Sequence, residues 1–181
     1  MRVISGSARG LKLKSPDGIE TRPTLDRVKE AVFSMLFPYL NGALVLDLFA
    51  GSGALGIESL SRGADRAFFV DSSQNAIKCM ESNIASARFS ENADVYEEDA
   101  ISFLKRCDKT FDIIFLDPPY TKNLYKNVIE MIAEKKLLSS DGLIVVEWDD
   151  ESDFVAAENQ LFEVFKEKKY GRVGITVLKW S

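Results

Sequence analysis

The segment 44–63 constrains the fold of this chain more than any other part of the sequence. It opens with the apolar run Leu44-Val45-Leu46, typical of a buried parallel strand, and continues as D-L-F-A-G-S-G-A-L-G at positions 47–56. A helical pattern follows and ends near Gly63. Glycines in such a turn allow positive φ angles and close approach of a ligand, which the free N–H groups at the helix start then face. The segment therefore predicts a strand, a glycine-rich turn and a helix that form a ligand site.

An acidic residue is the second feature that points to that ligand site. The run from Ala67 to Val70 predicts the next strand, and Asp71 stands at its carboxyl end, twenty residues after Gly51. In a nucleotide-binding βαβ unit, an acidic residue at this place reaches the ribose hydroxyls. The two features together predict an adenosine-containing ligand, for which a nicotinamide cofactor fits as well as any other. The alternative is a tight turn that binds nothing.

Strands and helices alternate along the remainder of the chain. Helices are expected over about 24–37, 73–88, 100–107, from 124 onward and over 151–158, and further strands over 93–96, 111–116, 143–148, 162–170 and 174–180. Pro38 predicts that the first helix ends or kinks near Phe37, and residues 140–142 predict a turn. The alternation predicts an α/β fold with a mostly parallel seven-stranded sheet, one antiparallel strand in the final hairpin, and helices on both faces.

The N-terminal region differs in charge from the rest. Residues 2–5 and 11–14 flank a glycine-containing turn and predict a β-hairpin arm over 1–23, followed by a main domain over 24–181. The first thirty residues hold seven basic and four acidic side chains, whereas the whole chain has a net charge of −5. A basic arm on an acidic body suits contact with a polyanion, although charge alone favours an ordinary solvated hairpin.

Composition excludes several kinds of site. The chain has no histidine, which removes the Ser-His-Asp and Cys-His schemes and the commonest metal ligand. Cys79 and Cys107 lack C-x-x-C spacing and are expected to be buried, reduced thiols, so no metal is expected. The N-terminus lacks the apolar core of a signal peptide, and no apolar run could span a bilayer. A cytoplasmic protein without membrane contact is therefore expected.

Four acidic residues follow predicted strand ends, namely Asp47, Asp71, Asp99 and Asp117. Ligands of open α/β sheets bind outside the carboxyl ends of the strands, so all four are expected to converge on one crevice, where Asp99 can accept a hydrogen bond from an adenine amino group. Asp117 is followed by Pro118, Pro119 and Tyr120. Proline has no N–H and a fixed φ, so the Pro118 carbonyl can point into the site.

This carboxylate, carbonyl and aromatic ring suit one reaction type. An exocyclic nucleobase amine is a poor nucleophile because its lone pair is delocalised into the ring. Two acceptors hold its hydrogens and draw it toward a pyramidal geometry, while Tyr120 stacks on a base taken out of its helix. The electrophile would be the methyl group of S-adenosylmethionine (AdoMet), whose sulfonium leaving group needs neither metal nor histidine, so positioning supplies most of the rate.

These motifs resemble a known family. D-L-F-A-G-S-G at 47–53, the acidic strand end at Asp71 and D-P-P-Y at 117–120 resemble the Rossmann-like AdoMet-dependent methyltransferases that act on exocyclic amines. R-V-I-S-G-S-A-R-G-L-K-L at 2–13 and T-R-P-T-L-D-R-V-K-E-A-V-F-S-M-L at 21–36 narrow the likeness to the RsmD family of bacterial ribosomal RNA methyltransferases, over essentially the whole chain. That family methylates guanine N2 in small-subunit rRNA within a partly assembled subunit.

The resemblance implies roles for individual residues. The implied cofactor-binding residues are Asp47, Phe49, Gly51, Gly53, Asp71, Ser72, Asp99 and Ala100, with Asp71 on the ribose and Asp99 and Ala100 on adenine. Asp117, Pro118 and Tyr120 would hold the target amine and base. Candidates for RNA contact are Arg2, Arg9, Lys12, Lys14, Arg22 and Arg27. The acidic overall charge suggests that affinity relies on a local patch with ribosomal protein contacts added.

Three other functions remain open at this stage. A nicotinamide-dependent oxidoreductase would share the glycine turn and Asp71, but it gives no reason for D-P-P-Y. An adenine-N6 methyltransferase of DNA or another RNA shares the amine-holding motif, although the chain is short for a separate DNA-recognition domain. A non-catalytic RNA-binding module would not need the set of cofactor residues.

Overall fold

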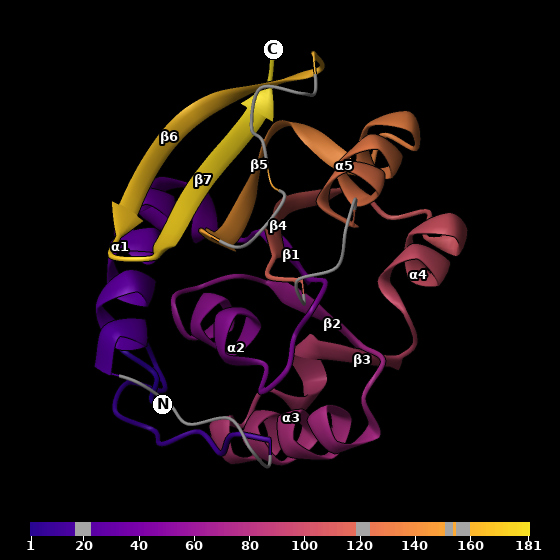
Figure 1. Cartoon of the computed structure of the whole chain (residues 1–181). Helices are drawn as coiled ribbons and strands as arrows, with labels where there is room; N and C mark the ends of the chain where they lie inside the picture. The colour runs from indigo at the N-terminus through magenta and orange to yellow at the C-terminus, as the bar shows by residue number, and fades with distance from the viewer. Residues whose placement is uncertain (17–22, 119–123, 151–153, 155–159) are drawn as a thin grey trace.

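A single mixed sheet organises the computed structural model of the chain, which describes residues 1–16, 23–118, 124–150, 154 and 160–181 (Figure 1). The described strands, in the order β3-β2-β1-β4-β5-β7-β6, are β1 Leu44–Asp47, β2 Arg66–Asp71, β3 Ala93–Glu97, β4 Phe111–Leu116, β5 Leu138–Asp149, β6 Phe162–Tyr170 and β7 Val173–Trp180. Among them β7 alone runs antiparallel to its neighbours β5 and β6, while β1 to β5 pair in parallel. The predicted seven-stranded sheet with one antiparallel strand is confirmed.

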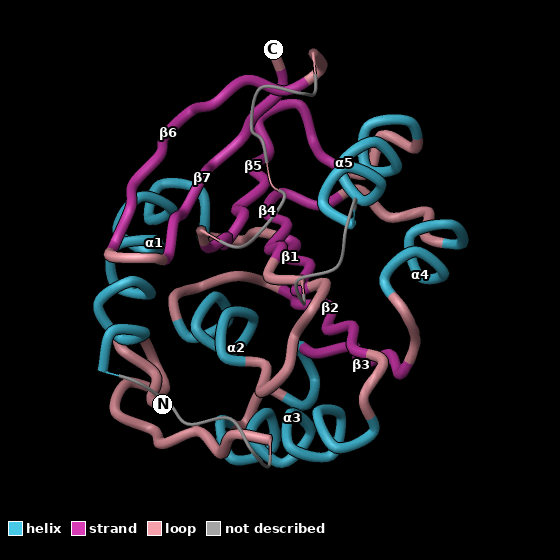
Figure 2. Tube along the Cα trace, viewed as in Figure 1, coloured by secondary structure: helices cyan, strands magenta, loops and turns pink. Residues whose placement is uncertain are grey.

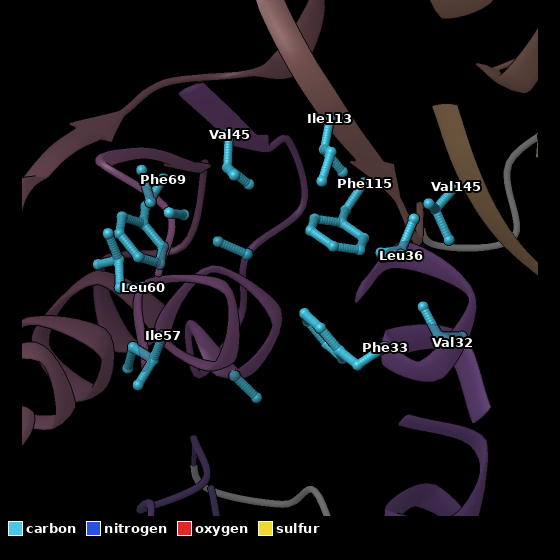
Figure 3. Packing of buried hydrophobic residues seen from close by; sticks show 14 of the residues in the cluster. Val32, Phe33, Leu36, Val45, Ile57, Leu60, Phe69, Ile113, Phe115 and Val145 are labelled. Atoms are coloured by element: carbon cyan, nitrogen blue, oxygen red, sulfur yellow. The ribbon is translucent and has the colours of Figure 1, made fainter. Parts of the chain in front are cut away.

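Helices cover both faces of this sheet. The described helices are α1 Pro23–Leu40, α2 Ala54–Ser61, α3 Gln74–Ala87, α4 Ala100–Arg106 and α5 Leu124–Glu134, with a short 3-10 turn at Ser90–Asn92. Successive strand residues alternate between the faces, so Val45 packs with α1 to α3 whereas Leu46 packs with α4 and α5. On the first face, Phe33 of α1 lies 5.8 Å from Phe115 of β4 between ring centroids (Figure 3).

Two local predictions are wrong. The first helix does not end near Phe37 but runs through Pro38 to Leu40, because Leu36 and Leu40 are buried in the core and hold the last turn in place. The alternative of a kink near Phe37 stays a prediction. Residues 140–142 form no separate turn, since β5 begins at Leu138 and the pairing with β4 shifts register there as a bulge. The helix expected over 151–158 falls mostly outside the described residues.

The N-terminal arm packs onto the domain instead of projecting from it. An antiparallel bridge joins Arg2 to Lys12, and Val3 and Leu13 lie in the same apolar cluster as α1 and α2. Figure 2 shows this segment as loop, running beside α3, where the Lys14 backbone N–H donates to the Asn83 side chain at 2.8 Å. The described residues therefore include a hairpin-like arm that shares the main core, and the boundary between 1–23 and 24–181 stays a prediction.

The last two features concern membrane contact and the cysteines. No helix among the described residues has the length and apolar character needed to cross a membrane. No disulfide links Cys79 and Cys107 in the described part of the chain, and of the two expected buried thiols Cys107 is buried whereas Cys79 is half-buried.

Candidate active site

The glycine-rich turn between β1 and α2 has the predicted conformation. Gly51 and Gly53 have φ angles of +53° and +76°, in the left-handed region that favours glycine. A Cβ at Gly53 would lie 2.8 Å from Met80 Cγ, and one at Gly56 would lie 2.2 Å from Phe69 Cε1, so α2 packs closely against α3 and β2. A Cβ at Gly51 would meet no atom within 4 Å. The turn thus presents open backbone at Gly51 and tight packing behind it.

Two strand-end carboxyls brace this turn. The Asp71 carboxylate accepts hydrogen bonds from the backbone N–H groups of Gly51 and Ser73, both at 2.8 Å. The Asp47 carboxyl accepts one from the N–H of Gly56 at 3.0 Å. Asp71 therefore lies beside Gly51 as the sequence predicted, and both acids fix the start of α2 relative to the sheet.

A cavity of about 270 Å³ opens at the carboxyl ends of β1 and β4. From β1 the chain adds β2 and β3 on one side of the sheet and then β4 and β5 on the other, so the strand order switches between β1 and β4. Ligands of open α/β sheets bind at such a switch point. The cavity is lined by Met1, Ser15, Pro16, Val28, Lys29, Val32, Asp47, Phe49, Ala50, Gly51, Ser52, Ala54, Leu55, Asp117 and Glu147. It brings together four predicted site residues: Asp47, Phe49, Gly51 and Asp117.

Other predicted residues lie outside this cavity's wall. Those that the structure describes but the wall does not include are Gly53, Asp71, Ser72, Asp99, Ala100 and Pro118. Asp99 caps α4, where its carboxylate accepts from the Ser102 N–H at 3.0 Å, and hydrogen bonding from Ser102 lowers the pKa of Asp99. Pro118 and Ala100 are buried. Tyr120 lies outside the described residues, so its predicted role stays a prediction.

Negative charge is disfavoured inside the cavity. Desolvation is the main cause that raises the pKa of Asp47 to about 7, and nearby Asp117 and Asp71 add repulsion. Desolvation, then repulsion from Asp149, raises the pKa of Asp117 to about 6. The Asp117 side chain is exposed because it faces the open cavity. The protein packed around the cavity still disfavours its charged form.

Glu147 is the site residue that sequence reasoning missed. It follows the buried run 143–146 inside β5, level with the end of β4 that Asp117 follows, and an acidic residue directly after such an apolar run was a signal in the sequence. Desolvation, with Asp117 as the next cause, raises the pKa of Glu147 to about 8. Among the described wall residues Lys29 is the one basic side chain. A cationic ligand would therefore relieve an unfavourable concentration of carboxyl groups.

Lys29 is itself held by a buried charged network around Glu58 of α2. The Glu58 carboxylate is fully buried and accepts from the backbone N–H groups of Ile4 at 2.8 Å and Ser5 at 3.0 Å. Arg62 Nε lies 2.7 Å from this carboxylate, and Lys29 Nζ lies 3.2 Å from it. Burial lowers the pKa of Lys29, against the opposing effect of Glu58. The network fastens the arm and α1 to the helix that follows the glycine turn.

A second hollow, of about 720 Å³, lies between the arm and α1. It is lined by Arg2, Val3, Ile4, Ser5, Arg9, Gly10, Asp26, Arg27, Glu30, Ser34 and Arg62, and we call it the arginine groove. Three of the predicted RNA-contact residues, Arg2, Arg9 and Arg27, meet there. Lys14 lies elsewhere, with its Nζ donating to Ser82 Oγ, and Lys12 is bridged to Arg2 by backbone pairing. Arg22 lies outside the described residues.

Comparisons with known proteins cover nearly the whole chain. The model of the family described as conserved hypothetical protein 95 matches residues 1–179. YlbH of Bacillus subtilis is 44% identical over 182 residues, covering 99% of this chain and 98% of the relative. Ribosomal RNA small subunit methyltransferase D of Haemophilus influenzae is 37% identical, covering 96% and 90%. The solved structure of yhhF from Escherichia coli is 32% identical with a TM-score of 0.90, covering 100% and 98%.

Proposed function

The chain belongs to the conserved hypothetical protein 95 family, the RsmD family that its motifs resemble, and from that premise we propose its reaction. It is a methyltransferase of small-subunit ribosomal RNA. It transfers the methyl group of AdoMet to the exocyclic N2 amine of a guanine, in an assembling subunit. The cavity at the switch point of the sheet is the site of transfer.

One observation carries this proposal: Asp117 and Gly51 line the same cavity. Methyl transfer requires the residues that grip the amine and the turn that holds the donor to open into one space. Asp117 is the first residue of D-P-P-Y, and Gly51 presents the open backbone of the glycine turn. A nicotinamide-dependent dehydrogenase would also use the glycine turn, but that function gives Asp117 no role.

The described residues fit AdoMet. Asp71, beside Gly51, would hold the ribose hydroxyls, and the backbone of the turn would contact the methionine part of the cofactor. Asp99 and Ala100 at the start of α4 would contact adenine. When bound, the cofactor supplies an electrophilic methyl group on a sulfonium cation. The carboxyls of Asp47, Asp117 and Glu147 favour such a cation, because it offsets their mutual repulsion.

Asp117 and its neighbours position the nucleophile. Asp117 accepts a hydrogen bond from the target amine, the carbonyl of Pro118 accepts a second, and Tyr120 stacks on the flipped base. The amine nitrogen then forms its bond to the methyl carbon as the carbon–sulfur bond breaks, and sulfur keeps the electron pair. Holding the reacting atoms in line is the main contribution of these residues to the rate.

The arginine groove would bind the RNA backbone. Arg2, Arg9 and Arg27 place guanidinium groups along one hollow, and guanidinium groups suit phosphate oxygens. Arg2 also pairs with Asp26 at 3.2 Å, and RNA phosphate would compete with this exposed ion pair. Ribosomal proteins of the assembling subunit would add contacts beyond this local patch, and such a substrate places the enzyme in the cytoplasm.

Labelled AdoMet and a panel of substrates test the proposal. The protein is incubated separately with small subunits lacking the modification, naked rRNA, tRNA and DNA, and the modified nucleoside is identified by mass spectrometry. We expect N2-methylguanosine in small-subunit rRNA. Methylated adenine, a modified DNA, or binding of NADH in place of AdoMet in a fluorescence titration would contradict it.

A variant separates the two halves of the site. Asp117→Ala should abolish methyl transfer and leave AdoMet affinity in calorimetry largely unchanged, because Asp117 contacts the amine and not the cofactor. Asp141→Ala, which removes an exposed carboxyl from β5, is the matched control and should retain full activity. Loss of cofactor binding in Asp117→Ala would contradict this division of roles.

A further inference from the structure

Glu147 of β5 lies level with Asp117, the residue that follows β4. Val146 and Leu116 are register partners on these parallel strands, so Glu147 within β5 and Asp117 just beyond β4 each follow one of two paired residues. Both side chains line the cavity. The hydroxyl of Tyr125 donates to the backbone carbonyl of Glu147 at 3.0 Å, which ties this part of β5 to α5. Glu147 is therefore held in place at the cavity wall.

The alternation of side chains along the strands brings the cavity acids to one face. Leu46, Leu116 and Val146, the residues before the three acids, all pack in the cluster with α4 and α5. Asp47, Asp117 and Glu147 follow them directly, so each acid falls on the opposite face, toward α1 and α2. No group of three or more His, Cys, Asp or Glu among the described residues could hold a metal ion. The shared face thus offers carboxyl oxygens to a ligand that carries hydrogens or positive charge.

The proposed reaction needs such an acceptor. The target nitrogen begins as a neutral amine with two hydrogens and becomes positively charged when its bond to the methyl carbon forms. It must then lose one proton. Asp117 and the Pro118 carbonyl hold the two hydrogens of the amine in the proposed complex, and a backbone carbonyl cannot take up a proton, so the released proton needs a carboxylate acceptor in the cavity wall. Of the two other acids in the described wall, Asp47 already accepts a hydrogen bond from the Gly56 N–H. Glu147 follows Val146, the register partner of the Leu116 that precedes Asp117.

We propose that Glu147 is a second catalytic carboxyl, which accepts the proton that the methylated amine releases. This inference rests on the proposed methyl transfer. In the step, the nitrogen–carbon bond forms, the carbon–sulfur bond breaks with its electron pair going to sulfur, and the nitrogen–hydrogen bond breaks with its proton going to the Glu147 carboxylate. The neutral acid returns this proton to water before the next turnover.

The surroundings of Glu147 predict how the rate depends on pH. The described charged groups that line its cavity are Asp117 after β4, Asp47 on β1 and Lys29 on α1, and Asp149 of β5 acts on Asp117. Burial, then repulsion from Asp117, raises the pKa of Glu147 to about 8 and so favours its neutral form at pH 7, and the pair that it forms with Asp117 titrates as a unit. Single-turnover methylation should therefore accelerate as the pH rises toward 8 and above, where Glu147 loses its proton.

Single-turnover kinetics with labelled AdoMet and unmodified small subunits test this from pH 6 to 9. Glu147→Gln keeps the side-chain shape but accepts no proton, and general-base catalysis is typically worth about 100-fold or more. We expect Glu147→Gln to lose about 100-fold in rate at pH 8.5, and to lose the alkaline rise, with AdoMet affinity within about threefold of wild type. Glu134→Gln, an exposed position on α5, is the matched control and should keep the wild-type profile.

The outcomes separate this inference from the proposed function. If the wild-type protein methylates small subunits and Glu147→Gln keeps both its rate and its pH profile, the role of Glu147 is refuted and the methyltransferase stands. If the wild-type protein methylates no RNA, the proposed function itself fails. If Glu147→Gln does not fold, the wild-type profile decides alone, because a rate that stays flat from pH 6 to 9 overturns the proposal.

Discussion

Removing the Glu58 carboxylate should destabilise the protein more than any surface change. Its oxygens receive two backbone N–H groups of the arm and the cations of Lys29 and Arg62, and Lys29 is 6% exposed. Glu58→Ala removes the carboxylate from donors that are buried or partly buried. Breaking a buried ion pair by removing one partner costs about 3–5 kcal/mol. In a chain of this size each kcal/mol lowers Tm by about 2–4 °C, so we expect a decrease of roughly 6–20 °C.

Urea denaturation followed by circular dichroism measures this loss, and native-state hydrogen exchange locates it. The amides of Ile4 and Ser5 donate to Glu58, so their protection should fall further than that of the central strands. Glu58→Gln should lie between wild type and Glu58→Ala, because one amide oxygen replaces two carboxylate oxygens that face donors. Glu134→Ala, on the exposed side of α5, should change the free energy of unfolding by less than about 0.5 kcal/mol.

The reasoning is refuted by a small effect. If Glu58→Ala lowers the free energy of unfolding by less than about 1 kcal/mol, with the slope m against urea unchanged, the network contributes less to stability than we propose. Unchanged exchange at Ile4 and Ser5 would separately refute the idea that Glu58 fastens the arm.

Three further expectations follow from the site. Gly56→Ala places a Cβ 2.2 Å from Phe69 Cε1, so it should lower the free energy of unfolding in urea by about 1–3 kcal/mol. It should also weaken AdoMet binding in calorimetry, and an unchanged affinity and stability would contradict the close packing. Burial raises the pKa values of Asp47, Asp117 and Glu147 to about 7, 6 and 8, so the folded chain holds their protons more tightly than the unfolded chain. The free energy of unfolding without cofactor should therefore fall as the pH rises from 5 to 8, with little else titrating because the chain has no histidine, and a rising profile would contradict this. Arg9→Ala and Arg27→Ala should each weaken binding to small subunits and lower the steepness of log affinity against log salt by about 0.7–0.9. Lys78→Ala on α3 is the control and should do neither. Equal slopes in all three variants would exclude the arginine groove as the RNA contact.

The parts of the site that sequence could predict are those set by local chain geometry. The left-handed φ angles of Gly51 and Gly53 follow from a turn that only glycine adopts easily, and Asp71 follows from the length of one βαβ unit. Asp117 is recognised because two prolines mark the strand end that it follows. Each of these signals lies within a few residues of the group that it predicts.

The rest depends on contacts between distant segments. Glu58 has the spacing of an ordinary helix residue, and its burial arises only because the arm docks on α2. Glu147 ends an apolar run without any accompanying motif, so only the register of β5 beside β4 places it in the cavity. Pro38 shows the reverse case, in which packing of Leu40 overrides a local rule about helix ends.

The docking of the arm has a consequence for biosynthesis. Residues 4–14 form hydrogen bonds with residues 58–83, across sequence separations of 53 to 69. During translation the first segment to leave the ribosome must therefore wait until α2 and α3 have emerged before its backbone groups find these partners. The groove is lined by residues up to Arg62 and the cavity by residues up to Glu147, so a nascent chain can complete the groove once α2 has emerged but completes the cavity only after most of β5 is made.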